Sequence, residues 1–166
     1  AVNYNGPIAV RYPRGEAYDG LEEHRNPIVK GRSERIFRGR DIALVAVGSM
    51  VKTGVEICEK MKEEGREITL VNARFVKPLD EKILDVLAQE HSLIVTMEEN
   101  VKTGGFGEAA ADYLRRTHPQ VTVLTVALPD RFIEHGNPEK LKPLAQIDAE
   151  SIYRRIKEET PDERTS

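Results

Sequence analysis

Mostly apolar runs alternate with amphipathic stretches along the chain from Asp41 onward. Such runs are typical of strands buried on both faces of a parallel sheet, and the stretches between them carry apolar side chains at helical spacing. The predicted strands are 42–47, 68–71, 93–96 and 121–126. The predicted helices carry their apolar side chains within 51–61, 83–87, 108–117 and 149–156, with a short helix near Pro138, and Asp80 is the candidate cap at the start of the helix that contains 83–87. This alternation predicts an α/β fold with three layers, α/β/α, around a mainly parallel sheet of about five strands.

The first forty residues follow a different pattern. Residues 7–10 form a short apolar stretch that is expected to be one strand, and residues 16–26 show no hydrophobic period. Residues 27–39 are expected to form a weak strand or hairpin that leads into the core. We therefore expect an extended N-terminal segment at 1–15, a linker at 16–40, a compact domain at 41–157 and a disordered tail at 158–166.

Composition and charge exclude several classes of protein. The 166 residues carry a net charge of −3, which gives no reason to expect nucleic-acid binding. The apolar runs are far shorter than the ~20 residues that span a bilayer, so we expect no membrane insertion. The single cysteine, Cys58, excludes an internal disulfide, and it falls on the buried stripe of a predicted helix. The four histidines are too widely spaced to suggest a metal site.

Polar residues at the predicted strand ends are candidates for chemistry, because ligands of open α/β sheets favour the carboxyl ends of strands. They suggest a small-molecule or anion site, although strand ends are polar in any case. Glu98 and Glu99 are a candidate acid/base pair, but adjacent residues of an extended chain point to opposite sides and are not expected to share one proton. We expect them instead to cap the following helix or to pair with an arginine of another domain. The candidate interface or anion-loop residues are Glu98, Glu99, Asn100, Gly104, Gly105, Gly107, Arg131 and His135.

Two further features suggest anion binding. The glycines at 104–107 precede a predicted helix, and their bare amides suit a phosphate, but a tight turn and close packing explain them equally well. Arg11 and Arg14 lie in the string RYPRG, where Pro13 stiffens the chain. Two close arginines are suited to gripping a phosphate or carboxylate, and a plain surface pair is the alternative.

Several strings, taken together and in order, carry a family resemblance. GPIAVRYPRG, DIALVAVGSM, VNARFVKPLDE, TMEENVKTGGFG and ALPDRFIEHG resemble the C-terminal part of the 1-deoxy-D-xylulose-5-phosphate synthases, which are transketolase-like enzymes. The resemblance implies a transketolase C-terminal-like fold. It also implies a parent enzyme that uses thiamine diphosphate and Mg²⁺ to condense pyruvate with glyceraldehyde 3-phosphate, releasing CO₂. The product of that reaction would be a precursor for isoprenoid, thiamine and pyridoxal biosynthesis. The parent enzyme would be a homodimer, located in the cytoplasm of a bacterium or in a plastid if the source is a plant.

The same resemblance implies a division of labour between domains. Residues 1–15 would be the remnant of a preceding pyrimidine-binding domain, and Arg11 and Arg14 would include the group that binds the phosphate of glyceraldehyde 3-phosphate. The cofactor and metal ligands would belong to the two preceding domains, which would be this domain's partners together with the second subunit. The chain itself would hold no catalytic, cofactor-binding or metal-binding residue, would support interdomain and dimer packing, and would be inactive alone.

Other interpretations remain open at this point. The chain also resembles, more weakly, the C-terminal domains of transketolases and of 2-oxo-acid dehydrogenase β-subunits. A stand-alone flavodoxin-like binding module is the alternative from a different class. Because the chain does not begin with methionine, we expect a piece of a longer protein. Whether residues 11–15 pack against the domain separates an enzyme fragment from a stand-alone module. In a fragment these residues are a severed strand with no sheet to join, whereas in a module they should be ordered and packed.

Overall fold

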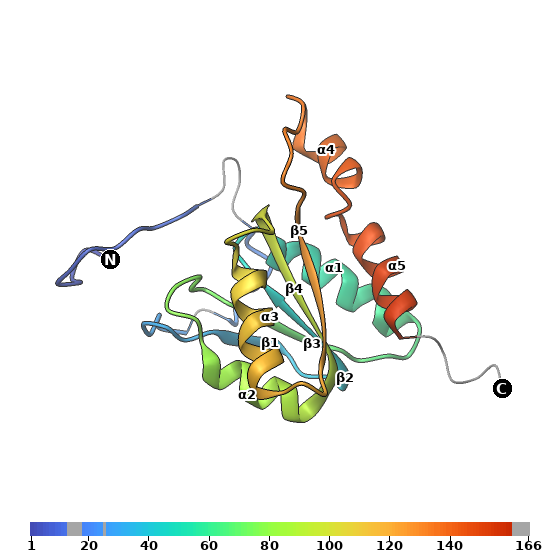
Figure 1. Ribbon diagram of the computed structural model, residues 1–166, viewed down its shortest axis with the longest axis horizontal. Helices are drawn as coiled ribbons and strands as arrows, with labels where there is room; N and C mark the ends of the chain where they lie inside the picture. The colour runs from blue at the N-terminus through green and yellow to red at the C-terminus, as the bar shows by residue number, and fades with distance from the viewer. Residues whose placement is uncertain (13–17, 25, 161–166) are drawn as a thin grey trace.

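One mixed sheet forms the centre of the molecule (Figure 1). The computed structural model describes residues 1–12, 18–24 and 26–160. Within them the strand order is β1-β3-β2-β4-β5, in which β2 to β5 are parallel and β1 pairs antiparallel with β3 at one edge. The strands are β1 (Glu34–Phe37), β2 (Asp41–Ala46), β3 (Thr69–Asn72), β4 (His91–Val101) and β5 (Thr122–Leu128).

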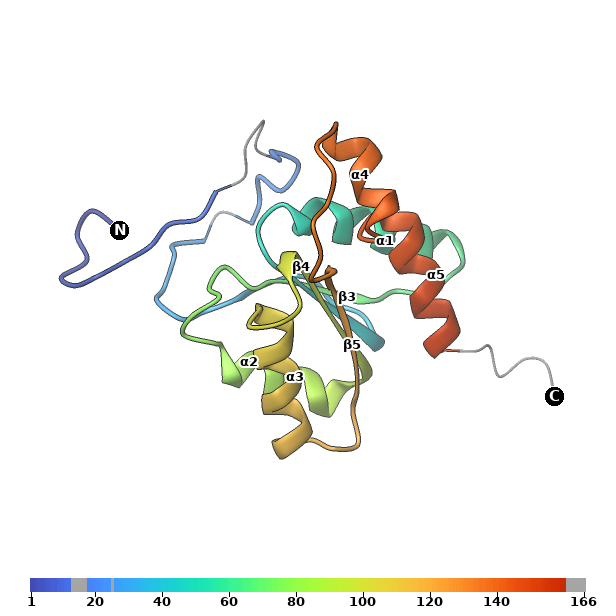
Figure 2. The same ribbon diagram turned by 45° about the horizontal axis from the view of Figure 1, so that its top comes forward.

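Helices cover both faces of this sheet, as Figure 2 shows. The helices are α1 (Met50–Glu63), α2 (Glu81–Glu90), α3 (Phe106–Thr117), α4 (Pro138–Leu144) and α5 (Ala149–Glu159). Helices α1 and α5 pack on one face and α2 and α3 on the other. The predicted three-layer α/β/α fold with a mainly parallel five-stranded sheet is therefore confirmed.

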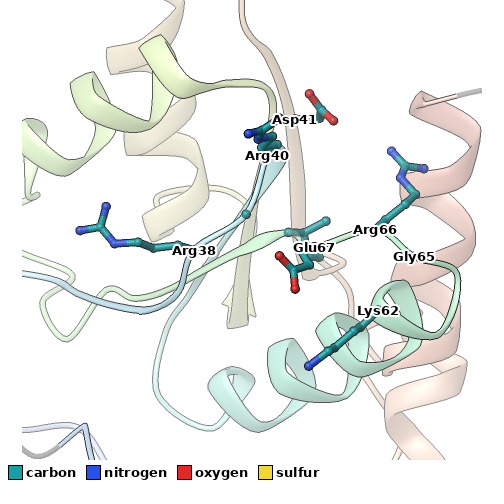
Figure 3. A pocket seen from close by; sticks show the side chains of 9 residues that line it. Arg38, Arg40, Asp41, Lys62, Gly65, Arg66 and Glu67 are labelled. Carbon is teal, nitrogen blue, oxygen red and sulfur yellow. The ribbon is translucent and has the colours of Figure 1, made fainter.

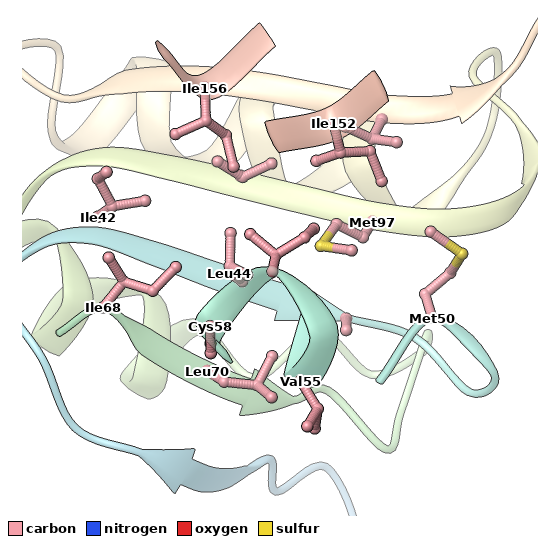
Figure 4. Packing of buried hydrophobic residues seen from close by; sticks show 14 of the residues in the cluster. Ile42, Leu44, Met50, Val55, Cys58, Ile68, Leu70, Met97, Ile152 and Ile156 are labelled. Carbon is pink, nitrogen blue, oxygen red and sulfur yellow. The ribbon is translucent and has the colours of Figure 1, made fainter. Parts of the chain in front are cut away.

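Alternation along the strands divides the core into two apolar clusters. Ile42 and Leu44 of β2 face α1 and α5, where Ile152 and Ile156 complete the layer shown in Figure 4. Ala43 and Val45 point to the opposite face, toward α2 and α3. Successive side chains of a strand point to opposite faces, so a continuous apolar run fills both layers at once. This is why the four apolar runs mark the parallel strands.

Individual boundaries differ from those expected. Strand β4 extends from His91 to Val101, well beyond 93–96, and α3 begins at Phe106. Helix α2 begins as predicted after Asp80, whose side chain accepts a hydrogen bond from the amide of Ile83. Helix α1 ends before Gly65, which has a φ of 77° that favours glycine.

The N-terminal region corrects one expectation. Residues 7–10 form no strand, and the described N-terminal arm, residues 1–12, extends away from the sheet in Figures 1 and 2. An apolar strand needs a neighbour to receive its backbone hydrogen bonds, and the described chain places none beside it. Strand β1 is the strand expected within 27–39, so the sheet begins inside the range 16–40 that we expected to be a linker. Helix α5 continues through Glu159, and residues 161–166 of the expected tail lie outside the described residues.

Candidate functional site

The carboxyl ends of the parallel strands β2, β3, β4 and β5 lie along the same edge of the sheet, perpendicular to the strands, and the candidate polar residues lie there. Ser49 follows β2 directly, and Glu98 and Glu99 lie near the end of β4. Helix α4 and the loop before it stand over the ends of β4 and β5 (Figure 1). Residues from distant parts of the sequence therefore meet at this edge.

The side chain of Glu98 binds backbone amides at the N-terminus of α3. Its side chain is buried, and its two oxygens accept hydrogen bonds from the amides of Phe106 (3.0 Å) and Gly107 (2.7 Å). The amide of Gly104 donates to Oε2 of Glu108 at 2.6 Å. The glycines at 104–107 suggested that backbone amides here could bind an external anion. In the structure these amides instead donate to carboxylates of the chain itself. Glu98 performs one of the two roles expected for these carboxylates, the capping of the following helix.

Close packing explains two of the three candidate glycines. A Cβ atom at Gly105 would lie 2.6 Å from Oε1 of Glu98, and one at Gly107 would lie 2.6 Å from Cγ2 of Thr125. Real Cβ atoms do not approach so closely, so a side chain at either position would push α3 off the sheet. Gly104 meets nothing within 4 Å but has a φ of 72°, which favours glycine in the turn.

Glu99 has a separate set of partners. Its Oε2 accepts a hydrogen bond from Oγ of Ser49 at 2.6 Å, and its Oε1 lies 3.0 Å from Nζ of Lys142 in α4. Burial alone would raise the pKa of Glu99, but the Ser49 hydroxyl, the Lys142 ammonium and the charge of Arg11 outweigh it and lower that pKa. The carboxylate is therefore held in its charged form and is a poor proton acceptor.

Arg11 reaches the same point from the N-terminal arm. Its Nη2 donates a hydrogen bond to the backbone oxygen of Glu99 at 3.0 Å. The apolar residues around it are not packed: Ile8, Val10 and Tyr12 are 50%, 64% and 81% exposed. Arg14, the second candidate for anion binding, lies outside the described residues.

A cavity of about 400 Å³ lies beside Glu99 and Lys142. It separates the ends of β4 and β5 from α4, and His135 is part of its wall. Of the candidate residues, the structure thus brings Glu99, His135 and Arg11 to one end of the sheet, whereas Asn100 and Arg131 are exposed and are not among the residues that line the cavity. Lys142 was not predicted, because its position depends on how α4 folds back over the sheet.

A larger depression of about 720 Å³ lies at the amino ends of β2 and β3, opposite the carboxyl ends described above (Figure 3). Arg38, Arg40, Lys62 and Arg66 give it a positive character, offset in part by Asp41 and Glu67. In Figure 3 the side chain of Arg38 points away from that of Arg66, so the cationic groups do not converge on one point. The depression lacks the geometry of a clamp for a small anion.

The carboxylates of the sheet edge do not fit a Mg²⁺–diphosphate site. Both oxygens of Glu98 accept backbone amides, and those of Glu99 bind Ser49 and Lys142. Among the described residues no group of three His, Cys, Asp or Glu side chains is placed to hold a metal ion. Within the same residues, no helix has the length and apolar character needed to cross a membrane. We therefore derive no catalytic step through a cofactor held by these residues.

Comparison with known families agrees with this fold. Residues 31–152 match the family model described as "Transketolase, C-terminal domain". The chain belongs to this family. The matched range begins just before β1, so the family's domain includes the strand that lies within the expected linker.

Among curated proteins, the chain is similar to 1-deoxy-D-xylulose-5-phosphate synthases. The 1-deoxy-D-xylulose-5-phosphate synthase of Lachnoclostridium phytofermentans is 46% identical over 156 residues, covering 93% of this chain and 25% of that protein. The synthase of Alkaliphilus oremlandii is 39% identical over 98% of this chain and 26% of its own length. That of Aquifex aeolicus is 40% identical over 93% and 25%. The chain spans about a quarter of the length of the curated relatives that it matches.

Solved structures confirm the fold. A split-gene transketolase, described as an inactive β4 tetramer, superposes with a TM-score of 0.73 and 28% identity over 79% of this chain and 43% of that one. A transketolase of Pichia stipitis gives a TM-score of 0.57 at 21% identity over 78% of this chain and 18% of that one, which supports the fold alone. The chain is thus a transketolase C-terminal domain of the synthase kind.

Proposed function

We propose that this chain is the C-terminal domain of a 1-deoxy-D-xylulose-5-phosphate synthase and that it supports packing between domains and subunits of that enzyme. The observation that carries the proposal is the 46% identity to such a synthase over 93% of the chain. The weaker identities to transketolases, 28% and 21%, make that alternative less well supported. The parent enzyme would condense pyruvate with glyceraldehyde 3-phosphate in the cytoplasm, with thiamine diphosphate and Mg²⁺ held by the preceding domains.

The N-terminal arm supports the assignment to a multidomain enzyme. Ile8, Val10 and Tyr12 expose apolar surface that a neighbouring sheet would cover. An apolar segment that is extended but unpaired fits a strand belonging to the preceding domain better than a segment of a stand-alone module. We therefore assign residues 1–15 to the edge of that domain and the compact fold to the C-terminal domain.

Arg11 and Arg14 are the residues to which we assign the phosphate of glyceraldehyde 3-phosphate. The bond from Arg11 to Glu99 uses one N–H of a guanidinium that has five, so donors remain for a phosphate oxygen. Charge-assisted hydrogen bonds contribute about 1.5–3 kcal/mol each. Loss of the responsible arginine should therefore raise the KM for this aldehyde roughly ten- to hundredfold, and should affect the KM for pyruvate much less.

A chimera tests the assignment. The chain would replace the matching C-terminal quarter of the L. phytofermentans synthase, and release of CO₂ from pyruvate in the presence of glyceraldehyde 3-phosphate would be measured. We expect activity from the chimera and none from the chain alone or from the relative truncated before the matching segment. A chimera that is folded but inactive, or turnover by the chain alone, would reject the proposal.

A further inference from the structure

Glu99 joins three segments that are far apart in the sequence. Its carboxylate binds Ser49 at the start of α1 and Lys142 in α4, and its carbonyl oxygen accepts the hydrogen bond from Arg11 in the N-terminal arm. We refer to Ser49, Glu99, Lys142 and Arg11 as the Glu99 junction. It is the contact by which the C-terminal domain holds the Arg11 head group.

The carbonyl of Glu99 is fixed from both sides. The preceding residue, Glu98, is buried and bound to two amides of α3, which holds the chain on the side of that helix. The Glu99 side chain is anchored on the other side by a hydroxyl at 2.6 Å and an ammonium at 3.0 Å. A carbonyl between two anchored side chains offers Arg11 a well-placed acceptor.

Charge adds to the hydrogen bond. The Glu99 carboxylate is about a quarter exposed, like its partner Lys142, so its field is only partly screened by water. Arg11 is near enough to help lower the pKa of Glu99, and the same attraction acts on the guanidinium. By contrast, the exposed neighbours of Arg11 in the arm give its side chain little packing.

We propose that Glu99 is a positioning residue for the acceptor phosphate: through its anchored carbonyl and its charge, it orients Arg11 toward the phosphate of the aldehyde substrate. This inference rests on the proposed function. It assigns the C-terminal domain a part in selecting a phosphorylated acceptor, with Arg11 as the residue of the Glu99 junction that would bind the phosphate. A guanidinium ordered before binding loses less freedom when the phosphate arrives, which favours the phosphorylated aldehyde over an unphosphorylated one.

The test uses the chimera with Glu99→Gln, which removes the charge and keeps the shape. Glyceraldehyde 3-phosphate, pyruvate and unphosphorylated D-glyceraldehyde would each be varied. Ordering one long side chain is worth about a two- to tenfold change in affinity, so we expect the KM for glyceraldehyde 3-phosphate to rise by that factor. The kcat and the KM values for pyruvate and D-glyceraldehyde should not change, because neither of those substrates uses the phosphate contact.

Glu150→Gln is the matched control. Glu150 is also a carboxylate paired with a lysine, Lys60, but it lies on α5 and is not part of the Glu99 junction. We expect this variant to leave all three KM values unchanged. Equal values in Glu99→Gln and Glu150→Gln, or a parallel rise for both aldehydes, would overturn the positioning role.

Two further variants keep the outcomes distinct. Arg11→Met should raise the KM for glyceraldehyde 3-phosphate more than Glu99→Gln does, and an unchanged KM would reject the phosphate assignment itself. If Arg11→Met has its effect and Glu99→Gln has none, only the positioning role fails. If Glu99→Gln does not fold, Lys142→Met removes one anchor of the same carboxylate and should give a smaller rise confined to the phosphorylated aldehyde.

Discussion

Replacing Glu98 with glutamine tests whether this candidate residue is structural. The carboxylate is 2% exposed and accepts two amides at the N-terminus of α3, at 3.0 and 2.7 Å. Glutamine keeps one carbonyl oxygen, but its NH₂ group would face the second amide as donor against donor. The variant therefore loses one charge-assisted bond, weakens the other and removes a negative charge from the helix N-terminus.

The magnitude follows from those three losses. A hydrogen bond to a charged group contributes about 1.5–3 kcal/mol, and a neutral one about 1 kcal/mol. The interaction of a charge with the helix dipole adds ~0.3–1 kcal/mol, and more in a buried position. We expect Glu98→Gln to reduce the free energy of unfolding by about 3–5 kcal/mol, which for a domain of this size lowers Tm by roughly 6–20 °C.

Urea unfolding of the chain, followed by circular dichroism at 222 nm, measures this change. The neighbouring Glu99→Gln variant is the control, because its carboxylate is more exposed and its partners are side chains. We expect that control to lose only about 1 kcal/mol. A loss below ~1 kcal/mol in Glu98→Gln would refute the view that Glu98 holds α3 in place, since that is less than one charge-assisted bond contributes.

Three further predictions concern other parts of the domain. Glu34→Ala should lower the free energy of unfolding by about 3–5 kcal/mol in urea melts, because it leaves the mostly buried, charged Arg74 without its carboxylate partner. The double variant Glu34→Met with Arg74→Met should recover much of this loss. Glu99 has a lowered pKa, so its stabilisation is present above the ordinary value of 4.5 and is lost as the pH falls through the folded-state pKa; the stability difference between the wild type and Glu99→Gln should disappear in melts at successively lower pH. Burial raises the pKa of the Cys58 thiol to about 12, so iodoacetamide at pH 8 should label Cys58 only after the chain unfolds, and rapid labelling of the folded chain would contradict its place in the core.

The apolar runs predicted the parallel strands because both of their faces are buried. A run such as 42–47 has to be apolar at every position when helices cover both sides of the sheet. Residues 7–10 have a similar pattern but form no strand, since pattern reports what a segment would bury and not whether a neighbour is present. The sequence thus predicted the elements better than their partners.

The candidate site shows the same division. Adjacent carboxylates on an extended chain point to opposite sides, which predicted that Glu98 and Glu99 would not share a proton; in the structure each carboxylate has its own partners. The contact of Glu99 with Lys142 was not predictable, because Lys142 lies 43 residues further along the chain and the return of α4 over the sheet depends on tertiary packing. The contact of Arg11 with Glu99 spans 88 residues and has no local signal at all.

The chimera measures the central claim most directly, namely that this chain supports synthase chemistry performed by residues outside it. Its rate of CO₂ release from pyruvate and glyceraldehyde 3-phosphate would be compared with the rates of the chain alone and of the truncated L. phytofermentans synthase. We expect activity in the chimera and in neither part alone. Turnover by the chain alone, or a folded chimera with no activity, would contradict it.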